Sequence, residues 1–305
     1  MQTIKEVAII LVNWSQKKLT EECLQSLFKI DNKNFDIILV DNDSKDDSVS
    51  FFKSKYPEIT IIVNSKNLGF TGGNNVGMKH AVNLGYKYIY LLNNDTEVEV
   101  NFINEVLNVA NSDSGIGIVG SSVFYFEPSN VIWFSGGQAN WLTGDMYDSR
   151  AGKIINIDKS VIEEVDEVAG AGMLIKSELL LEIGFLDERF FIYFEETDLC
   201  ARAKRNNWKV VWCPKSIVWH KVSSSFGEAS PIMVYLMTRN RWLFMKKNSP
   251  NFKMFVLYFM SKSVRDISRL IFTKKIILSK AILYGVFDAL FGVYGKGSIN
   301  IFKKE

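Results

Sequence analysis

The chain contains few of the residues that cross-link small folds or bind metals in clusters. Its 305 residues include three cysteines, two histidines and five prolines. Cys23, Cys200 and Cys213 have no metal-ligand spacing, which excludes a cysteine-based zinc site and a disulfide framework. We expect all three to be reduced thiols in the core.

Long hydrophobic runs are absent as well. No apolar run reaches the roughly 18 residues that a spanning helix needs; the stretch AILYGVFDALFGVYG is shorter and contains Asp288. The first apolar run is short and soon interrupted by charge, so we interpret it as a strand and not as a signal peptide. These patterns predict a cytoplasmic protein.

The charge is unevenly distributed. The net charge is +2, but residues 221–305 carry fifteen Lys and Arg against four Asp and Glu. A basic end on an acidic body predicts an anionic partner, either phospholipid headgroups or nucleic acid. Aromatic and basic residues do not alternate as in a base-stacking surface, which disfavours nucleic acid. The composition is otherwise that of a globular protein of one large domain, or of a domain with an appendage.

Apolar runs alternate with helical patterns over the first 120 residues. Strands are predicted at residues 7–12, 37–40, 59–63, 88–92 and 116–119, and helices at 20–28, 48–55, 73–84 and 101–111. This alternation predicts an α/β fold, with a mostly parallel sheet covered on both faces. Ligands of such sheets bind beyond the carboxyl ends of the strands.

Four successive strands end in amide or acid side chains, at Asn13, Asp41, Asn64 and Asn93. Asn and Asp also favour turns and helix caps, which would explain any single position. Their recurrence at four strand ends favours a polar site. The stretch NLGFTGGNNVG at residues 67–77 follows one of these strands. Its backbone could approach a phosphate, although a tight turn would explain it equally well.

Two further features could carry chemistry. Glu195, Glu196 and Asp198 directly follow the aromatic run 190–194 and precede a helical pattern. Acids are ordinary at a helix N-terminus, but beside aromatic rings a carboxyl is desolvated and its pKa rises toward that of a general base. His220 ends a strand-like segment beside a Ser- and Gly-rich loop. It could be structural or a metal ligand.

Together and in this order, several stretches resemble the inverting glycosyltransferases of family 2, which have the GT-A fold. They lie between residues 5 and 245 and read VNW, VDN, NLGFTGGNNVG, LLNNDT, GAGMLI, GFLDERFFIYFEETDLCAR and VWHKVSSSFG. The match is closest to the rhamnosyltransferase-like branch, which works on bacterial cell-surface polysaccharides. The resemblance implies a GT-A catalytic domain over residues 1–230 and a basic, helical region over residues 231–305.

The resemblance also implies the donor site. Asp41 would hydrogen-bond the nucleotide base, Asp95 would hold Mn²⁺ or Mg²⁺ at the diphosphate, and His220 would complete the metal shell. Asn93 stands where the family has a first Asp, so it is expected to contact sugar or ribose. The complete set of expected donor contacts is Asn13, Asp41, Asn67, Gly69, Asn75, Asn93 and Asp95.

Glu196 stands where the family's general base, usually Asp, is found. The longer side chain leaves Asp198 and Glu195 open as alternatives. The residues expected around the acceptor and the sugar are Gly172, Asp187, Glu195 and Arg241. Thr238 replaces the Gln of the Gln-x-x-Arg-Trp sequence of processive synthases, and no spanning helices flank it, so a processive synthase is disfavoured.

The basic tail carries an amphipathic pattern. Val264, Ile267, Leu270 and Ile271 form one apolar stripe, with basic residues mostly elsewhere. Such a helix either packs on its own domain or meets a membrane surface. The excess of Lys and Arg favours a tail on the inner face of the cell membrane, close to a lipid-linked acceptor.

The sequence thus predicts an inverting, metal-dependent glycosyltransferase. It would move a sugar, L-rhamnose, from a dTDP- or UDP-linked donor to a glycan or a lipid-linked acceptor. The alternatives are a transferase with a UDP-hexose donor and a non-catalytic module that binds nucleotide sugars or glycans. An NAD-dependent enzyme is disfavoured because the glycine fingerprint is missing.

Overall fold

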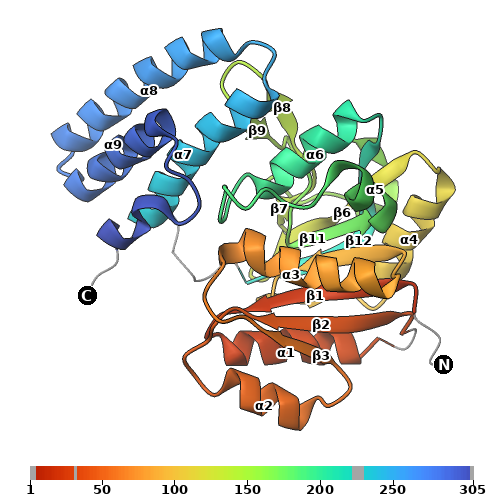
Figure 1. Cartoon of the computed structure of the whole chain (residues 1–305). Coiled ribbons are helices and arrows are strands. Elements are labelled where there is room, and N and C mark those ends of the chain that lie inside the picture. Colours follow the sequence, from red (N-terminus) through yellow and green to blue (C-terminus); the bar gives the residue numbers. More distant parts are fainter. Residues whose placement is uncertain (1–4, 31–32, 222–229, 303–305) are drawn as a thin grey trace.

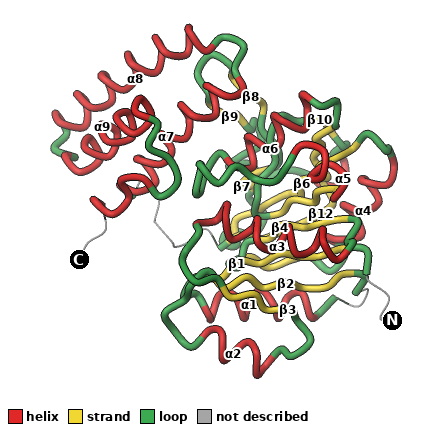
Figure 2. Tube along the Cα trace, viewed as in Figure 1, coloured by secondary structure: helices red, strands yellow, loops and turns green. Residues whose placement is uncertain are grey.

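The computed structural model describes residues 5–30, 33–221 and 230–302. A mixed, mostly parallel sheet is the centre of the fold (Figures 1 and 2). Its main strands follow the spatial order β10-β12-β6-β11-β4-β1-β2-β3, with β5 paired to β12 and β7 paired to β6. The strands are β1 (Val7–Asn13), β2 (Phe35–Asp41), β3 (Thr60–Val63), β4 (Tyr88–Leu92), β5 (Thr96–Val98), β6 (Ile116–Tyr125), β7 (Ile132–Phe134), β10 (Glu163–Glu164), β11 (Gly172–Lys176) and β12 (Lys209–His220). A separate ribbon pairs β8 (Gln138–Asn140) with β9 (Asp145–Tyr147).

Helices cover both faces of this sheet. The bounds are α1 (Lys17–Phe28), α2 (Ser48–Lys55), α3 (Gly69–Leu84), α4 (Phe102–Ser112), α5 (Ser177–Ile183) and α6 (Glu195–Arg205). Side chains of β1 alternate between the faces, so Ile9 packs with α1, α2 and α4 while Ile10 packs with α3, α5 and α6. The predicted α/β architecture is therefore confirmed.

The expected elements are found, with two informative differences. Helix α3 begins at Gly69, four residues before the predicted start, because the Asn67 side chain accepts a hydrogen bond from the Gly69 N–H at 2.7 Å. Strand β6 extends to Tyr125 because its second half pairs in parallel with β12, and this pairing carries β12 out to His220. Cys23, Cys200 and Cys213 are free and buried, as expected.

The C-terminal region is helical. It comprises α7 (Pro231–Asn248), α8 (Phe252–Phe272), α9 (Ile276–Phe291) and a short 3₁₀ segment, η2 (Gly297–Phe302). Helix α7 starts where the sequence predicts, with Ser230 as its N-cap; most of the predicted Ser- and Gly-rich join, residues 222–229, lies outside the described residues. Helices α7 and α9 approach closely at Gly285, where a Cβ atom would lie 2.8 Å from the Tyr235 carbonyl oxygen. None of the helices in the described ranges is long and apolar enough to cross a membrane.

Helix α7 is also bonded to the sheet domain. The Asn240 side-chain amide donates to the carbonyls of Phe190, Ile192 and Tyr193 at 2.8–2.9 Å. Lys247 pairs with Asp198 of α6 at 2.7 Å. The helical region is thus joined to the sheet domain by buried polar contacts.

Candidate active site

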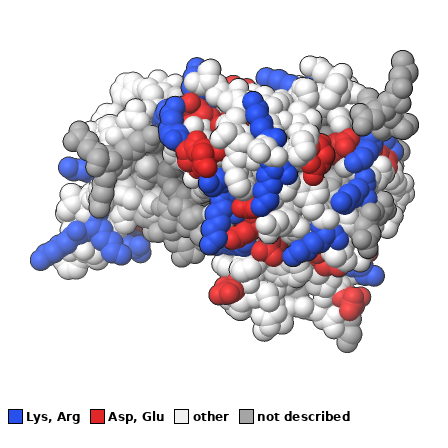
Figure 3. Space-filling view, turned by 90° about the horizontal axis from the view of Figure 1, so that it is seen from below, with Lys and Arg blue, Asp and Glu red and all other residues white. Residues whose placement is uncertain are grey.

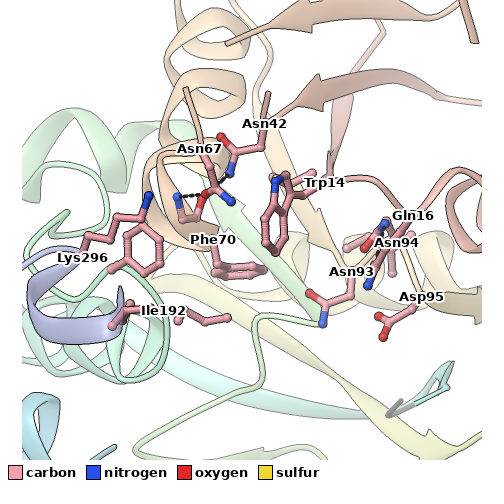
Figure 4. A pocket seen from close by; sticks show the side chains of 15 residues that line it. Trp14, Gln16, Asn42, Asn67, Phe70, Asn93, Asn94, Asp95, Ile192 and Lys296 are labelled. Atoms are coloured by element: carbon pink, nitrogen blue, oxygen red, sulfur yellow. Dashed lines mark hydrogen bonds between the residues drawn. The ribbon is translucent and has the colours of Figure 1, made fainter. Parts of the chain in front are cut away.

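A cleft opens beyond the carboxyl ends of β1, β2 and β4. It encloses about 160 Å³ and is lined from both the sheet domain and the C-terminal region (Figure 4). Its lining residues are Val12, Trp14, Gln16, Asn42, Asn67, Gly69, Phe70, Leu92, Asn93, Asn94, Asp95, Phe191, Ile192, Lys296 and Ile299. We call it the donor cleft below. In Figure 4, Lys296 and Asp95 lie at opposite ends of it.

One wall is built by the Gly-rich loop. The Asn67 carboxamide oxygen accepts from Asn42 at 3.2 Å as well as from the Gly69 N–H, and the Asn42 oxygen accepts from the Leu68 N–H at 3.0 Å. Gly69 has φ +75°, and a Cβ there would lie 2.4 Å from the Phe191 carbonyl oxygen. Only glycine fits at this close approach.

Asn13 and Asp41 meet beneath the cleft. The Asn13 amide donates to Asp41 at 2.9 Å, while the other Asp41 oxygen accepts the Ser44 N–H at 2.9 Å. Both side chains are buried, and their neighbours Trp14 and Asn42 form the lining. Direct contact of Asn13 and Asp41 with a nucleotide therefore stays a prediction.

The Asn75 side chain is hydrogen-bonded to the loop before α6, and its contact with the donor stays a prediction. It is hydrogen-bonded to both the N–H and the carbonyl of Leu186, at 3.1 and 2.8 Å, and reaches Glu188 at 3.0 Å. It ties α3 to the loop that precedes α6 and lies outside the lining of the donor cleft.

At the far end of the cleft, two segments that lie 125 residues apart meet: Asp95 lines the cleft, and His220 packs beside it, outside the lining. The antiparallel pairing of β5 with β12 sets His220 opposite Thr96. His220 Nε2 consequently lies 3.0 Å from Asp95 Oδ1 and 3.3 Å from Asn93 Nδ2. Asp95 and His220 are both largely buried, and the edge of Trp133 packs on the imidazole ring, with 4.8 Å between centroids.

This cluster fits a divalent cation. Asp95 offers a carboxylate and His220 an imidazole nitrogen. Asn93 turns its Nδ2 toward His220, and its Oδ1 is buried without a hydrogen-bond partner among the described residues. Oxygen and imidazole donors suit Mn²⁺ and Mg²⁺. Within the described part of the chain, no group of three His, Cys, Asp or Glu side chains could hold a metal ion. Oxygen atoms of a bound donor would have to complete the coordination.

The candidate general bases lie on the other side of a strained segment. Residues 190–194 connect the donor cleft to α6, and Phe191, Tyr193 and Phe194 all have positive φ angles of 68–72°. Such angles are costly for aromatic residues, so the surroundings must hold them in place. Asn240 does so through the three carbonyl contacts described above, and it thereby fixes the start of α6.

Glu196 faces a second cavity of about 230 Å³, which we call the carboxylate cavity. This cavity is also lined by Glu167, Tyr193, Thr197 and Arg241. Glu196 Oε2 is buried with no hydrogen-bond partner among the described residues. Burial raises the pKa of Glu196, and burial together with the Glu196 charge raises the pKa of Glu195 well above its usual range.

Asp198 is held in ion pairs. One of its oxygens accepts from Arg202 at 2.8 Å, and the other contacts Lys247 at 2.7 Å and Asn248 at 2.9 Å. Its side chain is fully buried and lines neither cavity. Of the three candidate bases, Glu196 is the one that faces an open cavity.

The four residues expected at the acceptor and the sugar do not lie together. Arg241 lines the carboxylate cavity and pairs with Asp145 at 2.8 Å. Asp187 pairs with Arg189 and Lys247. Burial alone would raise the pKa of Asp187, but the hydrogen bonds from these two residues lower it below its usual value. Gly172 is buried in β11, with Tyr90 Oη 3.1 Å from where a Cβ would stand. Glu195 is buried behind Glu196 and also lies outside both linings.

Sequence reasoning missed several lining residues. Trp14 directly follows Asn13, so the polar residue at the end of this strand could have pointed to it. Lys296 comes from a stretch more than 200 residues further along, with no pattern to connect it to the cleft. Burial and the Glu196 charge raise the pKa of Glu167 to about 8. In the sequence Glu167 is one of several nearby acids, and its role becomes visible only through its contact with Thr197.

Comparisons with known proteins identify the family of the chain. The family model described as "Glycosyltransferase like family 2" matches residues 5–244. The chain is 26% identical over 252 residues to the low-salt glycan biosynthesis hexosyltransferase Agl10 of Haloferax volcanii, covering 79% of this chain and 75% of that protein. It is 21% identical over 239 residues to the N-acetylglucosaminyl-diphospho-decaprenol L-rhamnosyltransferase of Mycobacterium tuberculosis, covering 72% and 77%.

A solved structure supports the same architecture. The mannosyltransferase PcManGT from Pyrobaculum calidifontis, in complex with GDP-Man and Mn²⁺, superposes with a TM-score of 0.58. The match covers 95% of this chain and 88% of that one at 10% identity. At this identity the likeness concerns the fold alone.

Proposed function

Because this chain belongs to glycosyltransferase-like family 2, has a GT-A-like fold and is a nucleotide-sugar glycosyltransferase, we propose that it transfers the sugar with inversion. A single displacement at the anomeric carbon needs a base for the acceptor hydroxyl, positive charge at the departing diphosphate and a pocket that holds the donor. In our proposal Glu196 is the base, the Asp95–His220 pair holds a divalent cation, and the donor cleft holds the nucleotide sugar.

The observation that carries the proposal is the position of Glu196. Its pKa is raised and one of its oxygens has no partner among the described residues, as for Glu195, but of the three candidate bases only Glu196 lines a cavity. The cavity residues Tyr193 and Phe194 directly follow Phe191 and Ile192 of the donor cleft. An acceptor that enters the carboxylate cavity would present its hydroxyl to Glu196 and its polar groups to Arg241. We propose this cavity as the acceptor side of the reaction.

A divalent cation would supply the charge that stabilises the leaving diphosphate. Asp95 and His220 would hold it, while Asn93, whose Nδ2 faces His220, would contact the sugar or ribose. The flat rings of Trp14 and Phe70 offer apolar surfaces to the nucleoside, while Lys296 offers a positive charge at the opposite end of the cleft.

The sugar is the least constrained part of the proposal. The two relatives divide between a hexosyltransferase and an L-rhamnosyltransferase, and the second acts on a diphospho-decaprenol-linked sugar. We propose a hexose or L-rhamnose as the transferred sugar and a glycan or lipid-linked acceptor. Binding of UDP-, dTDP- and GDP-linked sugars with Mn²⁺ present would decide the donor.

Replacement of the base tests the catalytic assignment. Glu196→Gln should lower kcat by about 10²–10⁴-fold, because the amide cannot accept the acceptor proton, and should leave donor affinity unchanged. In the native chain kcat/KM should fall with decreasing pH through the raised pKa of Glu196, since only the deprotonated carboxylate is active. This acid limb should lie above 4.5, the ordinary value.

Glu178→Gln, an exposed carboxylate on α5, is the matched control and should be neutral. Full turnover by Glu196→Gln would move the base elsewhere. If the native chain turns over no donor, the alternative of a non-catalytic module is reopened.

The metal assignment has a binding readout that does not depend on turnover. Asp95→Ala and His220→Ala should each weaken Mn²⁺-dependent binding of UDP or dTDP by about tenfold or more, because each removes one ligand. Isothermal titration calorimetry with and without Mn²⁺ measures this. His80→Ala, the chain's other histidine, should bind as the native chain does. Nucleotide binding that is indifferent to Mn²⁺ would refute the assignment.

A further inference from the structure

The turn between α8 and α9 is an exposed apolar and basic projection. Every residue from 271 to 277 is exposed, and we call this segment the hairpin tip. Its four large apolar side chains are Ile271, Phe272, Ile276 and Ile277, with Phe272 89% exposed. The tip is nevertheless ordered by backbone hydrogen bonds, from Lys275 N–H to the Leu270 carbonyl at 2.8 Å and from Lys274 N–H to that of Ile271 at 3.0 Å.

The apolar surface continues from the tip along α9. One side of this helix packs on α7 through small residues such as Ala281 and Gly285. The other side presents Leu283, Phe287, Leu290 and Phe291 to solvent, with Phe287 and Phe291 stacked on each other at 6.0 Å. These residues repeat at intervals of three and four, so they form a continuous stripe.

The apolar stripe that the sequence predicts lies on α8, and only half of it is buried. Ile267 and Leu270 are partly buried against the core of the C-terminal helices, whereas Val264 and Ile271 are 62% and 53% exposed. Packing on the protein's own helices therefore explains half of the pattern and leaves the other half uncovered. Isolated exposed apolar residues need no explanation, but a contiguous patch of this size marks an interaction surface.

The charges around this patch have one sign. Lys253, Arg265, Arg269, Lys274, Lys275 and Lys280 are exposed, and in the described part of the chain no carboxylate lies within ion-pair distance of them. Asp266 is paired with Lys262, and Asp288 of α9 is buried against Tyr235. In Figure 3 the part of the molecule that holds the C-terminal helices is mostly white, with blue patches at its outer edge.

We propose that the hairpin tip and the outer stripe of α9 dock on an anionic lipid surface. The apolar side chains would enter the interface between headgroups and acyl chains, while the unpaired lysines remain at the level of the headgroup phosphates. The lysines favour lipid over a second copy of the chain, because the same cations would face each other across a symmetric contact. None of these side chains lines the donor cleft or the carboxylate cavity, so the inference does not depend on the proposed reaction.

Flotation of the full-length protein with vesicles tests the proposal. The native chain should float with vesicles of phosphatidylcholine that contain roughly one third phosphatidylglycerol. With vesicles of phosphatidylcholine alone it should remain in the bottom fraction, and added salt should release it from the anionic vesicles. Lys274→Gln with Lys275→Gln should weaken partitioning by about 25-fold, from roughly fivefold for each charge. Phe272→Ser should weaken it by about tenfold through the lost apolar insertion.

Two control variants match these in exposure and chemistry. Lys53→Gln on α2 and Leu181→Ser on α5, which is 70% exposed, should float like the native chain. Thermal unfolding and nucleotide binding should be unchanged in all the variants, so that a folding defect is recognised as such. Failure to float, equal flotation with neutral vesicles, or flotation untouched by the tip variants would each overturn the proposal. So would a native dimer that Phe291→Ser separates, because the stripe would then belong to a second copy.

Discussion

At the scale of single residues, Lys296 gives the most direct test of the donor cleft. It reaches the cleft beside Asn67 from outside the sheet domain (Figure 4), and a nucleoside diphosphate is anionic. Since Lys296 lies at the end opposite the proposed cation, it would act on another part of the bound donor and through the field of its charge, and a hydrogen bond from a charged group contributes about 1.5–3 kcal/mol. Lys296→Ala should therefore weaken nucleotide-sugar binding by about tenfold or more and reduce its salt dependence, as measured by calorimetry. Lys296→Arg should restore most of the affinity.

The control for loss of a basic residue from the same region is Lys246→Ala, which removes an exposed lysine from the last turn of α7. It should bind nucleotide sugar as the native chain does. Native affinity in Lys296→Ala would show that the bound donor does not use this end of the cleft.

Residues of the candidate site could be predicted from the sequence where their immediate neighbours in the chain identify them. Asp95, Asn93 and Asn67 follow predicted strands, and the ends of parallel strands meet at one edge of the sheet. Local sequence could not show that Asp198 is held by Lys247, since that partner lies on α7. Nor could it place Asn75, whose amide is bound to Leu186.

At the scale of elements, the strained segment 190–194 depends on α7. Asn240→Ala removes three hydrogen bonds to buried carbonyls, which should cost about 2–3 kcal/mol of unfolding free energy. Because the segment leads into α6, the variant should also lower kcat by displacing Glu196, while binding of nucleotide and Mn²⁺ at the Asp95 end persists. Denaturant unfolding and steady-state kinetics measure the two effects. An unchanged kcat would show that Asn240 supports the fold without positioning Glu196.

Asn108→Ala removes an amide from an exposed position on α4 and is the control. It should change neither the unfolding free energy nor kcat.

The elements themselves were largely predictable, since period-2 and period-3.6 patterns reflect burial on one face. Strand β5 was not, because three residues carry no period. Its pairing with β12, which brings His220 to Asp95, is decided by contacts far apart in the chain.

At the scale of the whole molecule, the predicted division at residue 230 separates regions that share a site. The donor cleft takes Lys296 and Ile299 from the C-terminal region, and α7 is bonded to residues 190–193 and to α6. We expect scanning calorimetry to show a single cooperative transition for the full chain. Nucleotide with Mn²⁺ should raise its midpoint, because a ligand bound only by the folded state stabilises everything that unfolds with the site.

Gly285→Val makes this prediction sharper. The added side chain would meet Thr238 and the Tyr235 carbonyl at the contact of α7 and α9, far in sequence from the sheet, and overpacking of this kind costs about 1–3 kcal/mol. If the regions unfold together, the midpoint of the one transition should fall and the apparent nucleotide affinity near it should fall with it. Gly152→Val, at a loop glycine whose Cβ would meet no atom within 4 Å but whose φ is +76°, controls for strain without a contact between helices. Two separate transitions, with nucleotide shifting only the one that Gly285→Val leaves untouched, would show instead that the helices fold independently and that the cleft needs only the sheet domain.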